Sequence, residues 1–418
     1  MKARIVAIGD EILMGQTLDT NSHYLAKKLT ELGFDVEMIT AIHDDANSIK
    51  SRLNDIIGKV DLALFTGGLG PTSDDITKKT LAEFFGMPLI INKEVLQDVK
   101  KFLYDRNLEL NELNRKQALV PKGARIIRND IGTAPAMWFE KNNTVIISMP
   151  GVPFEMKYLF ENKITDLIKQ RFDLPLILIR FIHTLGLIEA DLAQKLANFE
   201  ANLPNNIKIA YLPSPEDIKI RLTAVGKDKK YLSSQLDKLV SEIKQRIGEY
   251  IFGYDDENIS SAIKKLLTGN GKTIAVAESC TGGNIAHLIT STPGSSEYFK
   301  GGIVAYSNEI KHKILGVNKE TLEKYGAVSR ECVIEMAQGV RRLLNTDYAV
   351  ATSGIAGPTG GSKDKPVGTV WVAVASENQT IAHKFLFGTM REINIRRSSA
   401  FALFELYKLI HNELTKNK

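Results

Sequence analysis

A serine lies where a short apolar run gives way to glycines, in the segment AVAESCTGG at residues 275–283. The apolar run predicts a buried strand, and the residues after it predict the start of a helix. Main-chain N–H groups at a helix N-terminus can stabilise an oxyanion, so Ser279 is well placed to act as a nucleophile. Ser and Thr before a helix are more often N-caps, and the segment taken alone favours that interpretation.

Two further segments supply partners for such a serine. GGIVAYSNEIKHKILG (301–316) brings Tyr306 to an expected strand end and Lys311 five residues later, and TSGIAGPTGG (352–361) predicts a glycine-rich loop. These segments contain no convincing His–Asp pair. A lysine can take the serine proton instead if burial lowers its pKa. Taken singly, Lys311 would be a solvated helix residue and Tyr306 a half-buried one.

Cys280 is an internal rival for the role of nucleophile. A thiolate at a helix N-terminus has a lowered pKa and is intrinsically reactive. Adjacent side chains in this turn point in different directions, so either Ser279 or Cys280 faces the site. The residues alone leave that choice open.

A second glycine-rich turn, TGGLGPTSDDIT (66–77), follows a predicted strand and precedes a predicted helix. Gly67, Gly68 and Gly70 allow a sharp turn that directs several N–H groups into one concavity. Such a nest binds anions, most often phosphate. The turn lies at the carboxyl end of a parallel strand, where open α/β sheets bind ligands.

Carboxylates accompany this turn. Asp74 and Asp75 close it, and Asp10 and Glu11 follow the first predicted strand. A carboxylate beside a phosphate predicts a bridging divalent cation, Mg²⁺, Co²⁺ or a similar ion. The alternative is that an aspartate caps the next helix and that Asp10 and Glu11 are ordinary charges at a helix start.

The elements that must position these groups alternate between strands and helices. The N-terminal part predicts a parallel, doubly wound sheet. The pattern changes near residue 170, where a smaller α+β unit begins. IFGYDDENIS (251–260) is a plausible linker, with Ser260 as the cap of the next helix, and a new α/β pattern follows.

Composition limits the classes of protein that fit. The 418 residues exceed a single core, so two or three domains are expected. A net charge of +5 does not by itself call for nucleic acid, and two cysteines suit a reducing cytoplasm. No apolar run is long enough for a membrane span. We therefore expect a cytoplasmic protein without membrane or nucleic-acid partners.

The C-terminal motifs resemble one family closely. AESCTGG, YSNE followed by a lysine, GAVS, TSGIAGP and KPVGTV occur in the order found in the C-terminal domain of the CinA (competence/damage-inducible) family, over about 258–415. The resemblance implies a nicotinamide-nucleotide amidase that needs no cofactor, with nicotinamide mononucleotide as substrate. It implies Ser279 as nucleophile, Lys311 as general base and Tyr306 as their partner. Candidate substrate contacts are Thr281, Gly282, Ser353 and Gly354.

The N-terminal motifs, GDEIL, TGGLGPT with its aspartates and PGVPFEM, resemble the molybdopterin-binding-like domain of the same family over about 1–165. The resemblance implies metal-dependent ADP-ribose pyrophosphatase activity, with Gly67, Gly68 and Gly70 on the substrate. The alternative is a pterin-binding domain without catalysis. Ala136 stands where family members commonly carry Gly, which puts this activity in doubt.

We therefore expect three α/β domains in a chain that forms a homodimer. They are a doubly wound molybdopterin-binding-like domain (1–168), a small α+β KH-like domain (169–252) and an α/β amidase domain (256–418). The middle unit lacks the GXXG loop with which KH modules hold single-stranded nucleic acid, so a spacer or dimer contact is expected there.

Overall fold

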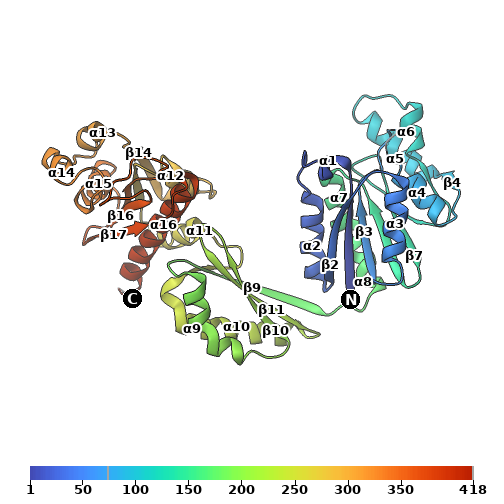
Figure 1. Ribbon diagram of the computed structural model, residues 1–418, viewed down its shortest axis with the longest axis horizontal. Helices are drawn as coiled ribbons and strands as arrows, with labels where there is room; N and C mark the ends of the chain where they lie inside the picture. Colours follow the sequence, from blue (N-terminus) through green and yellow to red (C-terminus); the bar gives the residue numbers. More distant parts are fainter. Residues whose placement is uncertain (73–74, 417–418) are drawn as a thin grey trace. The chain divides into compact units, whose positions relative to one another are not determined.

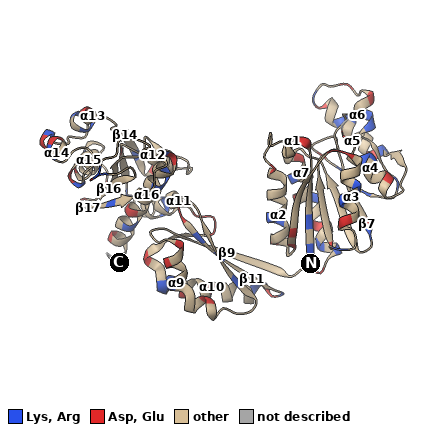
Figure 2. Cartoon of the chain, in the orientation of Figure 1, with Lys and Arg blue, Asp and Glu red and all other residues tan. Residues whose placement is uncertain are grey.

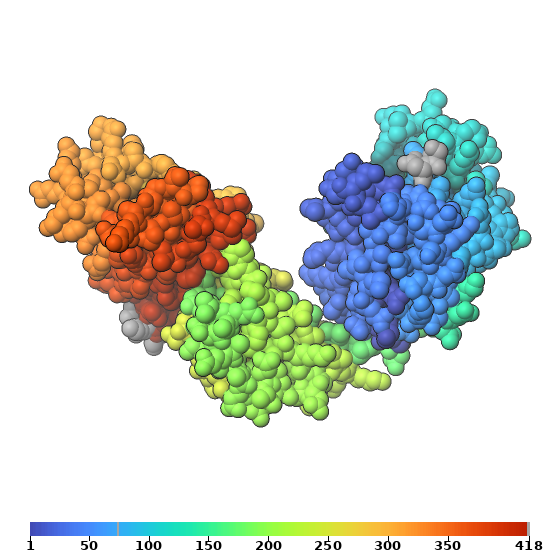
Figure 3. All heavy atoms as spheres, in the orientation of Figure 1, coloured from blue at the N-terminus to red at the C-terminus, as the bar shows by residue number. Residues whose placement is uncertain are grey.

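The computed structural model describes residues 1–72 and 75–416 (Figure 1). The chain divides into two compact units, residues 1–178 with 225–229, and residues 179–224 with 230–418. In the second unit the middle domain, green in Figure 3, packs against the orange and red C-terminal domain. Each unit is described by itself below.

The N-terminal domain is built on strands β1 (Lys2–Ile8), β2 (Asp35–Ile42), β3 (Leu62–Thr66), β6 (Arg125–Ile127), β7 (Ala136–Lys141) and β8 (Thr144–Met149). They form one sheet in the order β2-β1-β3-β8-β7-β6. The first four strands of that order are parallel, whereas β7 and β6 run antiparallel. The sheet is therefore mixed, with the predicted parallel core and an antiparallel edge. A separate hairpin pairs β4 (Leu89–Ile91) with β5 (Leu119–Pro121).

Helices cover both faces of this sheet (Figure 1). They are α1 (Asp10–Leu13), α2 (Thr20–Leu32), α3 (Ala46–Ile56), α4 (Thr77–Phe84), α5 (Lys93–Tyr104), α6 (Glu112–Lys116), α7 (Pro153–Leu159), η1 (Phe160–Ile164) and α8 (Thr165–Arg171). Helix α2 has clear limits, because Asp19 accepts a hydrogen bond from the Ser22 N–H at 2.8 Å and Gly33 ends the helix with a φ of 104°.

The middle domain has a four-stranded sheet in the order β10-β11-β9-β12. Its elements are β9 (Leu176–Thr184), α9 (Glu189–Ala201), β10 (Ile207–Pro213), β11 (Ile218–Gly226), α10 (Lys229–Ile247), η2 (Gly248–Tyr250) and β12 (Ile251–Tyr254). The expected linker at 251–260 is wrong at its start, because β12 pairs antiparallel with β9 and closes the sheet. Acidic and basic side chains both occur along α9 and α10 (Figure 2).

The C-terminal domain contains five strands, β13 (Ile274–Glu278), β14 (Phe299–Val304), β15 (Tyr348–Gly354), β16 (Thr369–Ala375) and β17 (Thr380–Leu386). Their order is β14-β13-β15-β16-β17. The first three are parallel, and the last two are antiparallel. The carboxyl ends of β13, β14 and β15 therefore meet at one edge of the sheet, where ligands of α/β sheets bind.

Two layers of helices enclose this sheet. One core cluster joins it to α11 (Ile259–Thr268), α12 (Asn284–Thr290) and α16 (Arg391–Lys416), and another joins its opposite face to α15 (Arg330–Leu343). Shorter helical segments are η3 (Ser295–Glu297), α13 (Asn308–Lys313) and α14 (Lys319–Lys324). Ser260 was predicted to cap α11, but Asn258 does so, because its side chain and that of Ser261 form a capping box.

None of the helices in the described part of the chain is both long and apolar enough to cross a bilayer.

Candidate active site

Ser279 stands directly after β13, the middle one of the three parallel strands, at the edge where these strands end. Its N–H donates to the Thr352 carbonyl of the neighbouring strand at 3.1 Å, which fixes the main chain at this point. Gly282 and Gly283 then turn the chain into α12 with φ values of 62° and 102°. Residues other than glycine rarely adopt such left-handed conformations, which explains why both positions of the turn are glycine.

Glu278 fills the first turn of α12 from the preceding strand. Its carboxylate is 1% exposed and accepts hydrogen bonds from the N–H groups of Gly283, Ile285 and Ala286 at 2.8–3.1 Å. The expectation that free N–H groups of this helix hold an oxyanion is therefore wrong for these three donors. Within the described residues, the N–H groups of Cys280 and Thr281, the next two residues after Ser279, donate to no other residue.

Lys311 reaches Ser279 from the helix that follows β14. Ser307 caps that helix, α13, by accepting from the Ile310 N–H at 3.2 Å. The Lys311 side chain is 1% exposed, and its Nζ lies 2.9 Å from the Ser279 Oγ. It also donates to the main-chain carbonyls of Ala305 at 2.7 Å and Tyr306 at 3.3 Å. The two groups that sequence placed in one pocket are thus in direct contact.

The surroundings of the Lys311 amine suit a proton acceptor. Burial lowers the pKa of Lys311, because the charged form loses its hydration. No carboxylate accepts a hydrogen bond from its Nζ among the described residues. A neutral amine has two N–H groups and one lone pair. The two carbonyls accept the N–H groups, which leaves the lone pair for the hydroxyl proton of Ser279.

Cys280 points into the protein core instead. It is 6% exposed and belongs to the apolar cluster between the sheet and its helices. Burial raises the pKa of its thiol to about 12, so the lowered pKa considered from its position near a helix start is wrong. A protonated thiol is a weak nucleophile, and this environment favours Ser279 over Cys280.

Tyr306 lies at the rim of the site and not beside the serine. Its side chain is 60% exposed, and its hydroxyl accepts a hydrogen bond from the Arg391 Nη2 at 3.0 Å. Arg391 also donates to the Gly357 carbonyl at 2.9 Å and so ties the glycine-rich loop to the start of α16. No motif marks Arg391 in the sequence, because it follows the loop at a distance and begins an ordinary helix.

The remaining candidates in this domain have internal partners. The Thr281 and Thr352 hydroxyls form a hydrogen bond at 2.8 Å, and the Ser353 hydroxyl donates to the Ala327 carbonyl at 2.7 Å. A Cβ on Gly354 would come within 2.6 Å of Val370, so glycine there allows β15 to pack against β16. A Cβ on Gly282 would meet no atom within 4 Å, which leaves open space on that side of the turn.

The N-terminal glycine turn is also tightly built. Gly67 and Gly68 have φ values of 116° and 64°, and a Cβ on either would lie 2.1 Å from a neighbouring oxygen. In this domain, the hydroxyls of Ser22, on α2, and of Thr77, at the start of α4, are buried without a hydrogen-bond partner. Thr77 Oγ1 is the atom nearest to Gly68. Buried polar groups are usually satisfied, so these two hydroxyls suit a bound polar ligand.

The carboxylates at this turn are occupied by the protein. Asp75 accepts from the Gly70 N–H at 2.7 Å and the Thr72 N–H at 3.0 Å, so it holds the turn together. Asp10 lies 2.7 Å from the His43 ring nitrogen, and Asp74 lies outside the described residues. The described chain contains no group of three or more acidic, His or Cys side chains that could hold a metal.

Ala136 occupies an interior position of the sheet. It is fully buried in β7 and pairs with Ile127 of β6. Its methyl group therefore packs in the core.

The fold and the site together define a three-domain α/β protein whose last domain holds a buried serine–lysine pair. The description "Probable molybdopterin binding domain" matches residues 4–170, "Damage-inducible protein CinA KH domain" matches 179–253, and "CinA C-terminal domain" matches 256–410. The chain belongs to the CinA family.

Full-length relatives support this assignment. A CinA-like protein of Flavobacterium psychrophilum is 44% identical over 419 residues, covering 100% of this chain and 99% of the relative. One from Cytophaga hutchinsonii is 43% identical, covering 97% of each. The solved competence/damage inducible protein CihA from Agrobacterium tumefaciens is 38% identical, covering 37% of this chain and 93% of its own, with a TM-score of 0.36.

Proposed function

We propose that the C-terminal domain is a nicotinamide-nucleotide amidase that converts nicotinamide mononucleotide and water into nicotinic acid mononucleotide and ammonia. The observation that carries the proposal is the 2.9 Å contact between Ser279 Oγ and the buried Nζ of Lys311. An amide needs a strong nucleophile, and a serine becomes one when a neighbouring base removes its proton. The family resemblance of the surrounding motifs supplies the substrate, and we expect the protein to act as a cytoplasmic homodimer.

The reaction proceeds in two halves. Ser279 Oγ attacks the carboxamide carbon while Lys311 takes the hydroxyl proton. The Cys280 and Thr281 N–H groups are proposed to hold the oxyanion, since they directly follow the nucleophile and donate to no other residue of the described chain. The Lys311 ammonium then protonates the leaving nitrogen, and ammonia departs. Water attacks the resulting ester while Lys311 takes one of its protons. The bond between the acyl carbon and Ser279 Oγ then breaks, Lys311 returns the proton to Oγ, and the acid leaves with both residues restored.

The direct test is ammonia release from nicotinamide mononucleotide by the full-length chain. We expect turnover without added metal, because the proposed chemistry uses only side chains and main-chain donors. Nicotinic acid mononucleotide should appear in equal amount. A folded preparation that binds the nucleotide but releases no ammonia would contradict the proposal.

Arg391 is proposed to bind the substrate phosphate beside the glycine-rich loop. Its guanidinium is exposed and already bridges the loop carbonyl of Gly357 and the Tyr306 hydroxyl. We expect Arg391→Ala to raise the KM for nicotinamide mononucleotide about 10–100-fold, because a charge-assisted phosphate contact would be lost. Arg391→Ala also removes the hydrogen bond between α16 and the Gly357 carbonyl of the loop. Nicotinamide riboside lacks the phosphate, so its turnover reports only the loss of the loop contact. We expect activity on the riboside to change much less than activity on the mononucleotide.

The N-terminal domain is proposed to bind the phosphates of ADP-ribose at its glycine turn. The unsatisfied Thr77 hydroxyl beside Gly68 favours this second function. A divalent cation such as Mg²⁺ or Co²⁺ is proposed to assist the cleavage, and the rate of ADP-ribose cleavage with and without each metal ion tests this requirement. Binding of a pterin in place of ADP-ribose would support the alternative assignment.

Gly68→Ala tests the N-terminal proposal. Its Cβ would meet Thr77 Oγ1 at 2.1 Å and adopt a φ that L-residues disfavour. We expect ADP-ribose binding, measured by calorimetry, to weaken at least about tenfold as the turn distorts. Ammonia release should be unchanged, since that site lies in the other unit. Gly86→Ala, at a positive φ with open space around it, is the control for backbone strain alone.

A further inference from the structure

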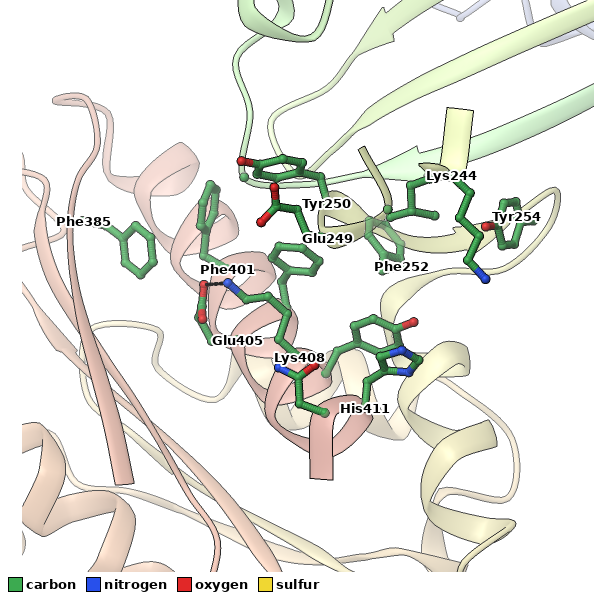
Figure 4. A pocket seen from close by; sticks show the side chains of 16 residues that line it. Lys244, Glu249, Tyr250, Phe252, Tyr254, Phe385, Phe401, Glu405, Lys408 and His411 are labelled. Atoms are coloured by element: carbon green, nitrogen blue, oxygen red, sulfur yellow. Dashed lines mark ion pairs between the residues drawn. The ribbon is translucent and has the colours of Figure 1, made fainter. Parts of the chain in front are cut away.

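A cavity of about 410 Å³ lies where the middle domain meets the C-terminal helix within the second unit (Figure 4). One wall comes from η2 and β12, and the other comes from the second half of α16. Its size falls within the range of small-molecule sites, which occur preferentially between domains. The residues of the Ser279 site are absent from its lining.

Aromatic rings dominate this cavity. Seven of the sixteen lining residues are Phe or Tyr, whereas aromatic residues make up 7% of the chain. Phe404 contacts Phe252 with ring centroids 6.2 Å apart, and Phe385 contacts Phe401 at 4.9 Å. These rings present flat apolar surfaces, on which a planar ring can stack.

Charges of both signs flank the rings. Glu405 and Lys408 of α16 pair with each other at 2.6 Å, shown by the dashed line in Figure 4. Glu249 and Lys244 also line the cavity, and neither has an ion-pair or hydrogen-bond partner within residues 1–72 and 75–416. A ligand there would meet an available carboxylate and an available ammonium beside stacked aromatic faces.

We propose that this cavity is a second small-molecule site, whose ligand joins a planar, positively charged ring to an anionic group, as a pyridinium nucleotide does. Aromatic faces attract a cationic ring through their quadrupoles, and Glu249 adds a compensating charge. Lys244 supplies the contact for the anionic phosphate. The inference is independent of the amidase proposal, because it uses none of the residues around Ser279.

The cavity itself offers a way to block it. Gly248 lines it with an ordinary φ, and a Cβ there would make only a 3.5 Å contact with the Lys244 side chain. Gly248→Leu should therefore fold and fill the space beside Lys244. Glu249→Gln removes the carboxylate charge with little change of shape, and Glu242→Gln on α10, which does not line the cavity, is its matched control.

The experiment counts bound nicotinamide mononucleotide by equilibrium dialysis, using the full-length Ser279→Ala chain so that no turnover occurs. We expect Gly248→Leu to remove one binding site per chain, and Glu249→Gln to weaken that site about three- to tenfold while Glu242→Gln has no effect. Adenosine monophosphate, with an uncharged ring, should bind this site more weakly.

The outcomes separate the two proposals. If Gly248→Leu folds with an unchanged melting temperature and leaves the number of sites unchanged, the second site is refuted, whatever happens at Ser279. If ammonia release fails but the Gly248-sensitive site remains, the amidase proposal fails alone. Equal or tighter binding of adenosine monophosphate would overturn the assignment of a cationic ring.

Discussion

Replacing Lys311 by Met is expected to lower the rate of ammonia release about 10²–10⁴-fold, the usual contribution of a positioned general base. Methionine fills a similar volume but cannot accept the Ser279 proton, whose oxygen lies 2.9 Å from the Lys311 Nζ. The measurement is kcat/KM for nicotinamide mononucleotide across pH. Lys313→Met is the matched control, since that lysine is exposed on the same helix and pairs with Glu309. Equal losses in both variants would refute the assignment of the base.

The same variant should be more stable than the parent protein. Burial lowers the pKa of Lys311 in the folded chain below 10.5, the ordinary value of an exposed lysine, which applies in the unfolded chain. Between these two pKa values the unfolded chain binds a proton that the folded chain has released, so the free energy of unfolding rises with pH across that window. Below the window the folded protein carries the cost of a buried ammonium. Lys311→Met removes that cost, so we expect its gain in the free energy of unfolding, measured with urea, to be greatest at low pH and to shrink as the pH rises across the window.

The parent enzyme should also lose activity as pH falls. Protonation of Lys311 fills the lone pair that receives the serine proton, so kcat/KM should decline below the pKa of that amine. Because that pKa is lowered by burial, the decline begins at a lower pH than for an exposed lysine.

Ser279→Ala is expected to reduce ammonia release by on the order of 10⁴-fold or more, because the covalent route is lost. Cys280→Ala should retain most of the activity, since the thiol lies in the core with a pKa raised to about 12. That second change is expected to cost about 1 kcal/mol of stability through lost packing. Parallel assays with mass spectrometry of trapped acyl-enzyme would decide between them. An acyl group on Cys280, or full activity in the Ser279 variant, would reverse the assignment.

Much of the fold follows from short-range patterns in the sequence. Apolar runs that end in glycine predict β1, β3 and β13, because buried parallel strands show little alternation. Strand β7 escaped prediction, since its apolar residues follow directly on the segment GTAP and its pairing with β8 depends on distant residues. The two antiparallel edges, at β7–β6 and at β16–β17, were unpredicted for the same reason.

Some residues of the candidate site were likewise predictable from the sequence, and others were not. Ser279 and Lys311 were assigned to one site because the serine needs a base and because their motifs resemble the family. In the structure both follow parallel strands, whose carboxyl ends share one edge. The contribution of Arg391 depends on where α16 begins in space, and no spacing rule gives that. The use of Glu278 as a helix cap could not be foreseen either, since a strand residue normally points away from the next helix.

The way the amine of Lys311 is held has a consequence for how the protein tolerates sequence drift. Two of its three contacts are main-chain carbonyls, at residues 305 and 306, which exist whatever side chains stand there. Saturation mutagenesis at the exposed position 306 should therefore yield many variants in which Lys311 Nζ still contacts Ser279 Oγ. Position 279 should not tolerate such substitutions, because its contact with Lys311 is made by the serine hydroxyl itself.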